Sequence, residues 1–459
     1  MASTAYDLII IGSGSGNALI GPEYENKRVA IVESGVFGGT CLNVGCIPTK
    51  MFVYAAEVAQ SARSASRYGI DAQIEDVSWP DIRDRVFSRI DPISDGGRDY
   101  RRDGSNTMLY AGRAEFAAPE TLVVKDSSQR SIAELTAPNI VVATGSEPVL
   151  PPVVAQSDVV VHTSDTVMRL DTLPASVLIV GGGYIAAEFA HIFADLGVTV
   201  TVINRGGGML RHLDEEISRR FTELAAQQWD VRFNTEVQTL RNVPGGVSAE
   251  LSDGTEVVTD VVLVATGRAP NSDLGLERAG IETRDDGRIA VDSFGRTSAP
   301  GVWALGDVSS PYQLKHVANH EARVVAHNLA HPDDMRVMRH DVVPSAVFTR
   351  PQIATVGLTE SQARAAGHDV SIKVQAYGDT AYGWAMEDSS SVLKLVGDRS
   401  TGLLLGAHFM GPQASSLIQP LIQAMTFGLP AQEMARGQYW IHPALAEVLE
   451  NALLGLELD

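Results

Sequence analysis

The stretch Gly38-Gly39-Thr40-Cys41-Leu42-Asn43-Val44-Gly45-Cys46-Ile47-Pro48-Thr49-Lys50 contains the only two cysteines of the 459-residue chain. A disulfide between them would close so short a loop that it removes little entropy from the unfolded chain, so a purely stabilising bridge is the weaker interpretation. Two free buried thiols that are neighbours by chance are a second alternative. The pair therefore predicts redox chemistry.

The spacing of the two cysteines also predicts the local backbone. On a regular helix their Cα atoms would lie roughly 8.6 Å apart, which exceeds the limit of about 7 Å for a disulfide. We therefore expect a bend, which Gly45 permits. Thr40 is expected to cap a helix that begins near Cys41 and continues through residues 50–68, and the positive end of that helix would favour a thiolate.

Composition limits the classes of function. The chain has 56 acidic and 36 basic residues and a net charge of −20, which disfavours nucleic acid and anionic lipid as partners. No apolar run approaches the roughly 18 residues that span a bilayer. The first residues lack the basic and apolar regions of a signal peptide, and with only two cysteines this predicts a reducing, cytoplasmic setting.

A first glycine turn follows an apolar run near the start of the chain. Gly12 and Gly14 are the glycines that let a strand turn into a helix whose N-terminus faces a pyrophosphate. Asn17 stands where a third glycine is usual, and Glu33 lies where an acid accepts a ribose hydroxyl. We expect strand, turn, helix and strand over residues 6–34.

The same pattern occurs a second time. Gly181 and Gly183 follow the apolar run 176–180, and each of the two units closes on an Ala-Thr-Gly strand end, at residues 143–145 and 265–267. The repeat predicts two dinucleotide-binding domains.

The second unit lacks the acid of the first. Asn204 and Arg205 follow its second apolar run, and Arg211 comes six residues after Arg205. Guanidinium groups in place of a carboxylate suit a 2′-phosphate, so we expect NADPH rather than NADH. Two solvated surface arginines are the alternative interpretation.

The rest of the chain changes character. Helical spacing occurs near residues 78–103 and 314–329, whereas alternating runs in the last 120 residues predict antiparallel strands, followed by helices at about 414–428 and 444–454. Asp307 follows a short apolar run and is free to bond a sugar-like hydroxyl, with a turn-capping role as the alternative.

His442 stands out near the C-terminus. Pro443 after it is expected at a helix start, which would place Glu447 one turn inside and close enough to orient the imidazole. A histidine with such a partner suits acid-base catalysis on a thiol. A structural histidine is the alternative.

Together these motifs resemble the flavin-dependent pyridine nucleotide-disulfide oxidoreductases, the group of glutathione reductase and dihydrolipoamide dehydrogenase. The resemblance covers essentially the whole chain, and residues 38–50 are its most specific part. It implies an enzyme that binds FAD in the first unit and NADPH in the second, and that reduces a low-molecular-weight disulfide through a Cys41–Cys46 redox disulfide.

The resemblance also implies roles for single residues. Cys46 would lie against the flavin and Cys41 would attack the substrate. Lys50 and Glu188 would pair near the reactive flavin nitrogen. His442 and Glu447 match a His-Pro-x-x-x-x-Glu motif that reaches into the partner subunit's site, which implies a homodimer with composite active sites. The expected cofactor contacts are Gly12, Gly14, Glu33, Gly39, Thr40 and Asp307 for FAD, and Gly181, Gly183, Tyr184, Arg205 and Arg211 for NADPH.

The predicted fold class is α/β, with two Rossmann-like dinucleotide-binding domains and a C-terminal α+β dimerisation domain. The expected boundaries are 1–149 and 269–340 for the two parts of the FAD-binding domain, 150–268 for the NADPH-binding domain, and 341–459 for the dimerisation domain.

Three segments, 51–59, 314–323 and 437–442, most resemble the branch of the family whose substrate is mycothione, the disulfide of mycothiol. No residue recognises the sugar of that substrate by chemistry alone. The alternatives are dihydrolipoamide dehydrogenase, against which the arginines argue, a glutathione reductase-like enzyme, and a non-enzymatic flavin-containing scaffold. Mercuric reductase is disfavoured because no cysteine lies near the C-terminus.

Overall fold

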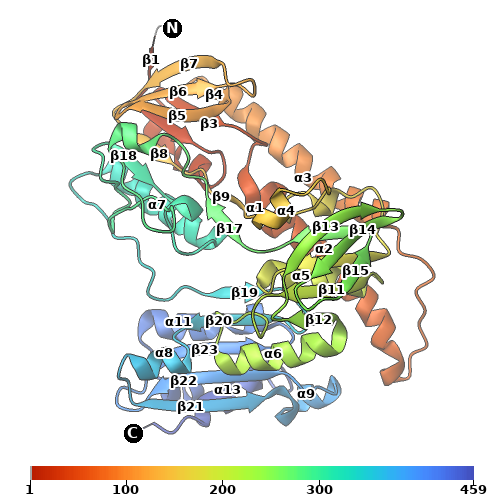
Figure 1. Cartoon of the computed structure of the whole chain (residues 1–459). Helices are drawn as coiled ribbons and strands as arrows, with labels where there is room; N and C mark the ends of the chain where they lie inside the picture. The colour runs from red at the N-terminus through yellow and green to blue at the C-terminus, as the bar shows by residue number, and fades with distance from the viewer. Residues whose placement is uncertain (1–2, 459) are drawn as a thin grey trace.

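A five-stranded parallel sheet forms the first part of the structure, a computed structural model that describes residues 3–458 (Figure 1). Its strand order is β18-β8-β2-β3-β4. The first four of these strands are almost entirely buried, as expected for apolar strands covered on both faces. The strands are β2 (Leu8–Ile11), β3 (Val29–Glu33), β4 (Thr107–Ala111), β8 (Ile140–Val142) and β18 (Val302–Ala304).

Two long helices accompany this sheet, α3 (Trp79–Arg102) and α7 (Lys315–Ala330), and both confirm the predicted helical stretches. A small second sheet has the order β1-β7-β6-β5. Its strands are β1 (Thr4–Ala5), β5 (Arg113–Ala118), β6 (Thr121–Lys125) and β7 (Ser131–Thr136). Because β18 pairs with β8, the chain returns to the first sheet after forming the second unit.

The helix expected after the first glycine turn is absent among the described residues, and this prediction was wrong. Two short 3₁₀ helices, η1 (Ser15–Leu19) and η2 (Pro22–Tyr24), connect β2 to β3 instead. The physical reason is the Gly21-Pro22 pair, because proline fixes its own φ and disfavours helical geometry at the residue before it.

The thiol segment forms two helices rather than one. The helix α1 (Gly39–Asn43) carries Cys41, and α2 (Cys46–Ser64) begins at the second cysteine. The predicted bend is confirmed at residues 44 and 45. Thr40 is not a cap, because α1 already begins at Gly39.

The second unit is built on a four-stranded parallel sheet of order β12-β11-β10-β16. Its strands are β10 (Ser176–Val180), β11 (Thr199–Asn204), β12 (Asp230–Phe233) and β16 (Val261–Val264), and its helices include α4 (Pro152–Ala155), α5 (Tyr184–Asp195) and α6 (Glu215–Gln228). An antiparallel sheet adds β13 (Val237–Val243), β14 (Gly246–Leu251) and β15 (Glu256–Thr259). The chain enters and leaves this unit through one antiparallel pair, β9 (Ser146–Pro148) and β17 (Arg268–Pro270).

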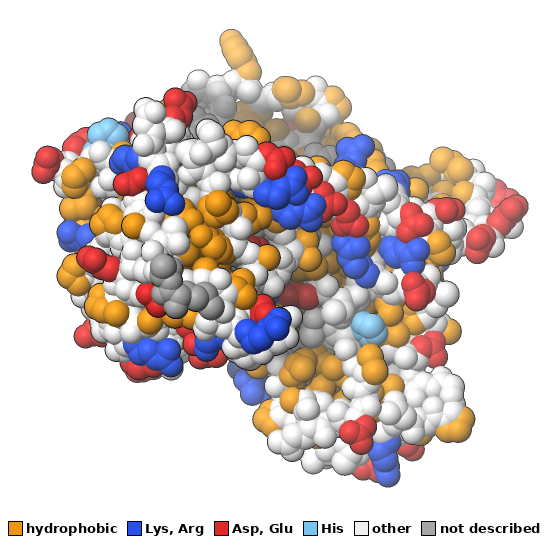
Figure 2. All heavy atoms as spheres, turned by 90° about the horizontal axis from the view of Figure 1, so that it is seen from above, with side chains coloured by type: hydrophobic (Ala, Val, Ile, Leu, Met, Phe, Trp, Pro, Cys, Tyr) orange, Lys and Arg blue, Asp and Glu red, His pale blue; other side chains and the backbone are white. Residues whose placement is uncertain are grey.

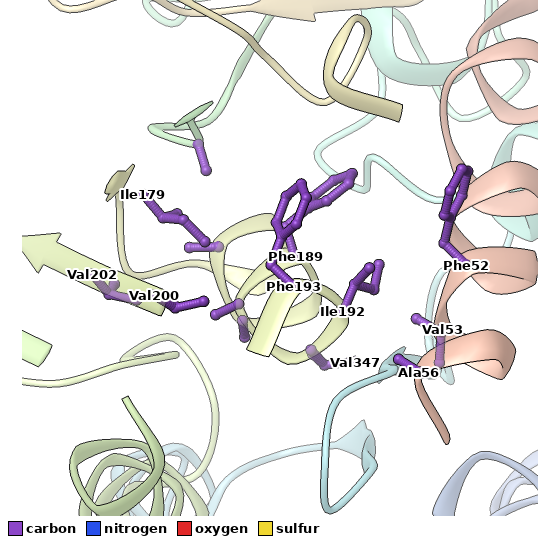
Figure 3. Packing of buried hydrophobic residues seen from close by; sticks show 14 of the residues in the cluster. Phe52, Val53, Ala56, Ile179, Phe189, Ile192, Phe193, Val200, Val202 and Val347 are labelled. Atoms are coloured by element: carbon purple, nitrogen blue, oxygen red, sulfur yellow. The ribbon is translucent and has the colours of Figure 1, made fainter. Parts of the chain in front are cut away.

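Helices α2 and α5 pack against each other and join the thiol segment to the second unit. Figure 3 shows Phe52, Val53 and Ala56 of α2 on one side of this contact, and Phe189, Ile192 and Phe193 of α5 facing them. These side chains are buried in one hydrophobic cluster. The packing matters for the site, because Lys50 lies two residues before Phe52 on α2 and Glu188 directly precedes Phe189 on α5. The contact between the two helices therefore brings these two charged residues toward each other.

The C-terminal part is a five-stranded antiparallel sheet of order β19-β20-β23-β22-β21, which confirms the predicted strand type (Figure 1). Its strands are β19 (Ser345–Val347), β20 (Ile353–Gly357), β21 (Val370–Ala376), β22 (Val392–Asp398) and β23 (Leu404–Met410). The helices are α8 (Glu360–Ala365), α9 (Ala381–Ala385), α10 (Ala414–Leu417), α11 (Gln419–Phe427), α12 (Ala431–Arg436) and α13 (Ala446–Leu454).

Helix α13 starts two residues later than predicted. Pro443 lies before the helix, in a cis peptide bond with His442, so it is not at the helix start. The expected 414–428 helix is divided into α10 and α11, with Pro420 in the first turn of α11.

The surface is charged and mixed. Lys and Arg side chains are interspersed with Asp and Glu on the face seen in Figure 2. Within residues 3–458, no helix is both long and apolar enough to cross a membrane.

Candidate active site

A cleft of about 1700 Å³ runs between the first unit, the second unit and the C-terminal sheet. It collects residues that are far apart in the sequence. The predicted site residues that line it are Gly12, Gly14, Glu33, Gly39, Thr40, Cys41, Cys46, Lys50, Tyr184, Glu188 and Asp307.

The first glycine turn and the thiol segment touch each other in this cleft. A Cβ atom on Gly39 would lie 2.6 Å from Gly14 Cα, so only glycine fits this contact. Glu33, at the end of β3, accepts hydrogen bonds from the backbone and side chain of Ser13, at 2.9 and 2.6 Å. The carboxylate therefore lies beside the turn, where a ribose next to a pyrophosphate would be held.

The two thiols are in hydrogen-bond contact across the bend between α1 and α2. A hydrogen bond from the Cys46 thiol lowers the pKa of Cys41 to about 7, with a smaller contribution from the charge of Lys315. The same hydrogen bond raises the pKa of Cys46. These shifts favour the thiolate form at Cys41 over Cys46, and a thiolate is the nucleophilic form of cysteine.

Behind the thiols, Lys50 and Glu188 approach each other across the α2–α5 contact. Burial lowers the pKa of Lys50 to about 8, opposed by the charge of Glu188, and burial raises the pKa of Glu188, opposed by Lys50. Phe348 holds both groups: its backbone N–H donates to Glu188 Oε1 at 2.9 Å, and its ring centroid lies 2.7 Å from Lys50 Nζ.

Asp307 and Tyr184 also line the cleft, and Tyr184 lies one turn before Glu188 on α5. Ser146 Oγ donates to Asp307 Oδ2 at 2.6 Å, while burial raises the pKa of Asp307. Tyr184 is the first residue of α5, and burial of its phenol raises its pKa to about 12. Both side chains carry hydroxyl or carboxyl oxygens that could contact a polar ligand in the cleft.

The residues present fit a flavin dinucleotide. Lys50 Nζ is buried and makes no hydrogen bond to any residue in the described range 3–458, although a buried ammonium requires a polar partner. The first glycine turn, the Glu33 carboxylate beside it and the Asp307 carboxylate all line this cleft. These groups suit a pyrophosphate, a ribose and a polyol chain.

Arg205 and Arg211 lie outside this cleft, in the loop that connects β11 to α6. Both side chains are exposed. Asn204 organises the loop, because its side-chain amide donates to the Gly208 carbonyl at 2.8 Å and accepts from the Gly206 N–H at 3.2 Å. The two arginines are therefore displayed from a braced loop beside the second glycine turn.

The structure does not bring His442 to the cysteines. His442 and Glu447 are absent from the residues that line the cleft, within the part of the chain that the structure describes. They do form the predicted pair: His442 Nδ1 and Glu447 Oε1 are 2.7 Å apart, and this hydrogen bond lowers the pKa of Glu447. The His442 side chain is 71% exposed.

Sequence reasoning missed a set of supporting residues. Arg268 donates through Nε to Ser146 Oγ at 3.0 Å and through Nη2 to the Ser146 carbonyl at 2.7 Å, and its Nη1 pairs with Asp165 Oδ1 at 2.8 Å. Ser146 and Arg268 each directly follow an Ala-Thr-Gly strand end. Their equivalent positions in the two units could have indicated from the sequence that they belong to the site. The sequence offered no such signal for Phe348, because this residue contacts Glu188 through its backbone N–H.

Comparison with known families assigns most of the chain. The family described as pyridine nucleotide-disulphide oxidoreductase matches residues 6–322. The family described as the pyridine nucleotide-disulphide oxidoreductase dimerisation domain matches residues 343–453.

Individual relatives match over nearly the full length. The chain is 58% identical to mycothione reductase of Mycobacterium tuberculosis, over 98% of this chain and 99% of that protein. It is 34% identical to glutathione reductase of Burkholderia cepacia, over 96% and 97%. Among solved structures, the HOCl-induced flavoprotein disulfide reductase RclA of Escherichia coli matches with a TM-score of 0.86 and 28% identity, over 98% of this chain and 100% of that one.

Proposed function

The chain belongs to the pyridine nucleotide-disulphide oxidoreductase family, and on this premise we propose that it is an FAD-dependent, NADPH-linked reductase of mycothione. The observation that carries the choice of substrate is the 58% identity to a mycothione reductase over almost the whole of both chains. The predicted domain boundaries and the cytoplasmic setting remain part of this proposal.

When bound, FAD supplies the transfer of two electrons from NADPH to the Cys41–Cys46 disulfide. The residues that would hold it are those of the first glycine turn, Glu33, Thr40 and Asp307. Lys50 and Glu188 would contact the ring, since the unpaired ammonium of Lys50 faces the same cleft as the thiols. Arg205 and Arg211 would bind the 2′-phosphate of NADPH.

The thiols then perform the exchange. The Cys41 thiolate attacks one sulfur of the substrate disulfide, which forms a mixed disulfide and releases the first thiol. Cys46 attacks Cys41 of the mixed disulfide, which releases the second thiol and restores the Cys41–Cys46 disulfide. Each thiol product needs one proton, and the lowered pKa of Cys41 makes it the attacking sulfur.

We assign the proton for the first leaving thiolate to His442 of the partner subunit. The His442–Glu447 pair lies on an exposed segment of the chain with two exposed apolar neighbours, Tyr439 and Ile441. A second copy of the chain would cover such residues and would bring the imidazole to the other subunit's thiols. The match to the dimerisation domain supports this arrangement.

The substrate is tested with purified enzyme, NADPH and a panel of small disulfides. NADPH should bleach the flavin absorbance, and mycothione should restore it faster than glutathione disulfide or lipoamide. NADH in place of NADPH serves as the control. Preference for lipoamide with NADH would reassign the chain to dihydrolipoamide dehydrogenase, and a flavin that NADPH cannot reduce would exclude the enzyme class.

The composite site has a separate test. Cys41→Ser and His442→Ala homodimers should each be inactive, but mixing them by denaturation and refolding, or by coexpression, should create hybrids in which one of two sites has both residues intact. Random mixing should then restore about a quarter of the wild-type activity, from the statistics of a two-fold dimer. Absence of recovery in confirmed hybrids would place His442 outside the neighbouring site.

A further inference from the structure

The first glycine turn lacks the helix that normally gives such a turn its positive charge. After Gly14 the chain forms η1, a 3₁₀ helix of five residues, and no α-helix begins within the described chain before Gly39. The second turn, by contrast, leads directly into the 12-residue helix α5. Because aligned peptide dipoles produce the positive end of a helix, η1 supplies less charge to a bound pyrophosphate than α5 does.

A lysine from a distant part of the sequence lies at this turn. Lys315, the first residue of α7, donates from Nζ to Ser15 Oγ at 2.9 Å, and Ser15 directly follows Gly14. Ser15 Oγ also lies 3.3 Å from Asn319 Oδ1, one turn further along α7. Ser15, Lys315 and Asn319 all line the main cleft, so the ammonium is on the ligand side of the turn.

Lys315 lacks the close carboxylate partner that each arginine of the cleft has. Arg113 pairs with Asp273 at 2.6 Å and Arg268 pairs with Asp165 at 2.8 Å. The two lysines of the cleft have only more distant charged neighbours, Glu188 for Lys50 and Asp307 for Lys315. Within residues 3–458, no carboxylate lies within 4.0 Å of Lys315 Nζ. Its only hydrogen-bond partner there is a hydroxyl, which a phosphate oxygen can replace.

Arg101 also contacts the first glycine turn, but it is not an alternative binding residue for the pyrophosphate. Its Nε donates to Asn17 Oδ1 at 2.7 Å and its Nη2 donates to the Asn17 carbonyl at 3.0 Å. These bonds fix the residue that stands in place of the third glycine. Arg101 does not line the cleft, so its charge is directed at the protein rather than at a ligand.

We propose that Lys315 binds the pyrophosphate of the flavin dinucleotide and replaces the positive helix end that the first glycine turn lacks. The inference rests on the proposed function, because it requires bound FAD. The geometry that carries it is the pairing of Lys315 Nζ with Ser15 beside Gly14, combined with the 3₁₀ helix at that turn. Lys315 is a cofactor-binding residue in this proposal, and its charge also makes a smaller contribution to the lowered pKa of Cys41.

The test is retention of flavin by the purified Lys315→Met holoenzyme. The flavin-to-protein absorbance ratio and the rate of FAD release on dilution should be measured at increasing NaCl concentration. Release should be about 10- to 100-fold faster than in the wild type, the range for loss of a charge-assisted hydrogen bond. Its dependence on salt should be weaker, because one ion pair with phosphate is missing.

Two matched variants keep the test specific. Lys315→Arg retains the charge and should restore most of the flavin retention. Arg323→Gln removes an exposed cation two turns further along α7 and should behave as the wild type. If Lys315→Met is unstable because it has lost FAD, its melting temperature measured with excess FAD should return to that of the wild type.

The results that would contradict the role of Lys315 differ from the result that would contradict the proposed function. Normal FAD release in Lys315→Met, with a changed pH profile of disulfide reduction, would show that the ammonium serves the Cys41 thiolate instead. Fast release that Lys315→Arg does not correct would show that the charge is not the cause. A wild-type protein that contains no flavin would overturn the proposed function itself.

Discussion

The two glycine turns of this chain have the same first half and different second halves. At Gly12 and at Gly181 the backbone has positive φ, +101° and +139°, and a Cβ atom on either would lie 2.3 Å from a carbonyl oxygen of the Ala-Thr-Gly strand end, that of Ala143 or Ala265. Beyond this point the first turn continues into 3₁₀ helices and the second into α5.

The comparison separates two requirements of a dinucleotide site. Close packing of the turn against the neighbouring strand requires glycine in both units, because any side chain would meet backbone atoms. The helix behind the turn is replaceable, because its contribution is electrostatic and a side chain such as Lys315 can supply positive charge from elsewhere. Four predictions test how far the two units work separately.

The largest effect is expected on removing the Cys41 thiol, because this change should stop disulfide reduction and leave flavin reduction by NADPH intact. In Cys41→Ser, disulfide turnover should fall by roughly a thousandfold or more, since the attacking nucleophile of a covalent mechanism is lost. NADPH should still bleach the flavin, because that step requires the two bound cofactors but not the Cys41 thiol. Stopped-flow absorbance measures the bleaching and steady-state assays measure turnover; appreciable turnover would remove Cys41 from the mechanism.

Alanine at the matched glycines should have opposite consequences. Gly181→Ala should reduce kcat/KM for NADPH by about a hundredfold, because the turn must move by an ångström or more, and should leave the flavin bound. Gly12→Ala should lose flavin instead. The flavin absorbance of the purified variants and titration with NADPH distinguish the two effects, and equal loss of flavin in both would show that the units are not independent.

The arginines of the second unit should affect one nucleotide only. Arg205→Ala and Arg211→Ala should each raise KM for NADPH by about tenfold, the low end for loss of one charge-assisted hydrogen bond to phosphate. KM for NADH serves as the internal control and should change little. A parallel rise for both nucleotides would assign the arginines to the structure of the loop.

The smallest effect concerns pH. Because the pKa of Cys41 is lowered to about 7, its thiolate is present above that pH and is lost as the pH falls through it. Reoxidation of the NADPH-reduced enzyme by disulfide should therefore rise about fourfold from pH 6.5 to pH 8. Flavin reduction by NADPH should not follow this profile, and a rate that falls with rising pH would contradict the assignment.

Much of the fold could be predicted from local pattern. Apolar runs ending in glycine, the repeated Ala-Thr-Gly strand ends and the alternating runs near the C-terminus gave two parallel sheets and one antiparallel sheet. The errors were also local. The Gly21-Pro22 pair argued against a helix after the first turn, and Gly39 displaced Thr40 from the cap position.

The sequence by itself determined the chemistry of the protein: a pair of sulfurs separated by a required bend, two glycine turns, and arginines in place of an acid at the second. These features depend on residues close together in the chain. Only the tertiary structure decided which groups share the cleft, because Lys50 meets Glu188 through the packing of α2 on α5, and Lys315 reaches Ser15 from 300 residues away. Such contacts are fixed by the burial of apolar faces, which local patterns specify in kind but not in partner.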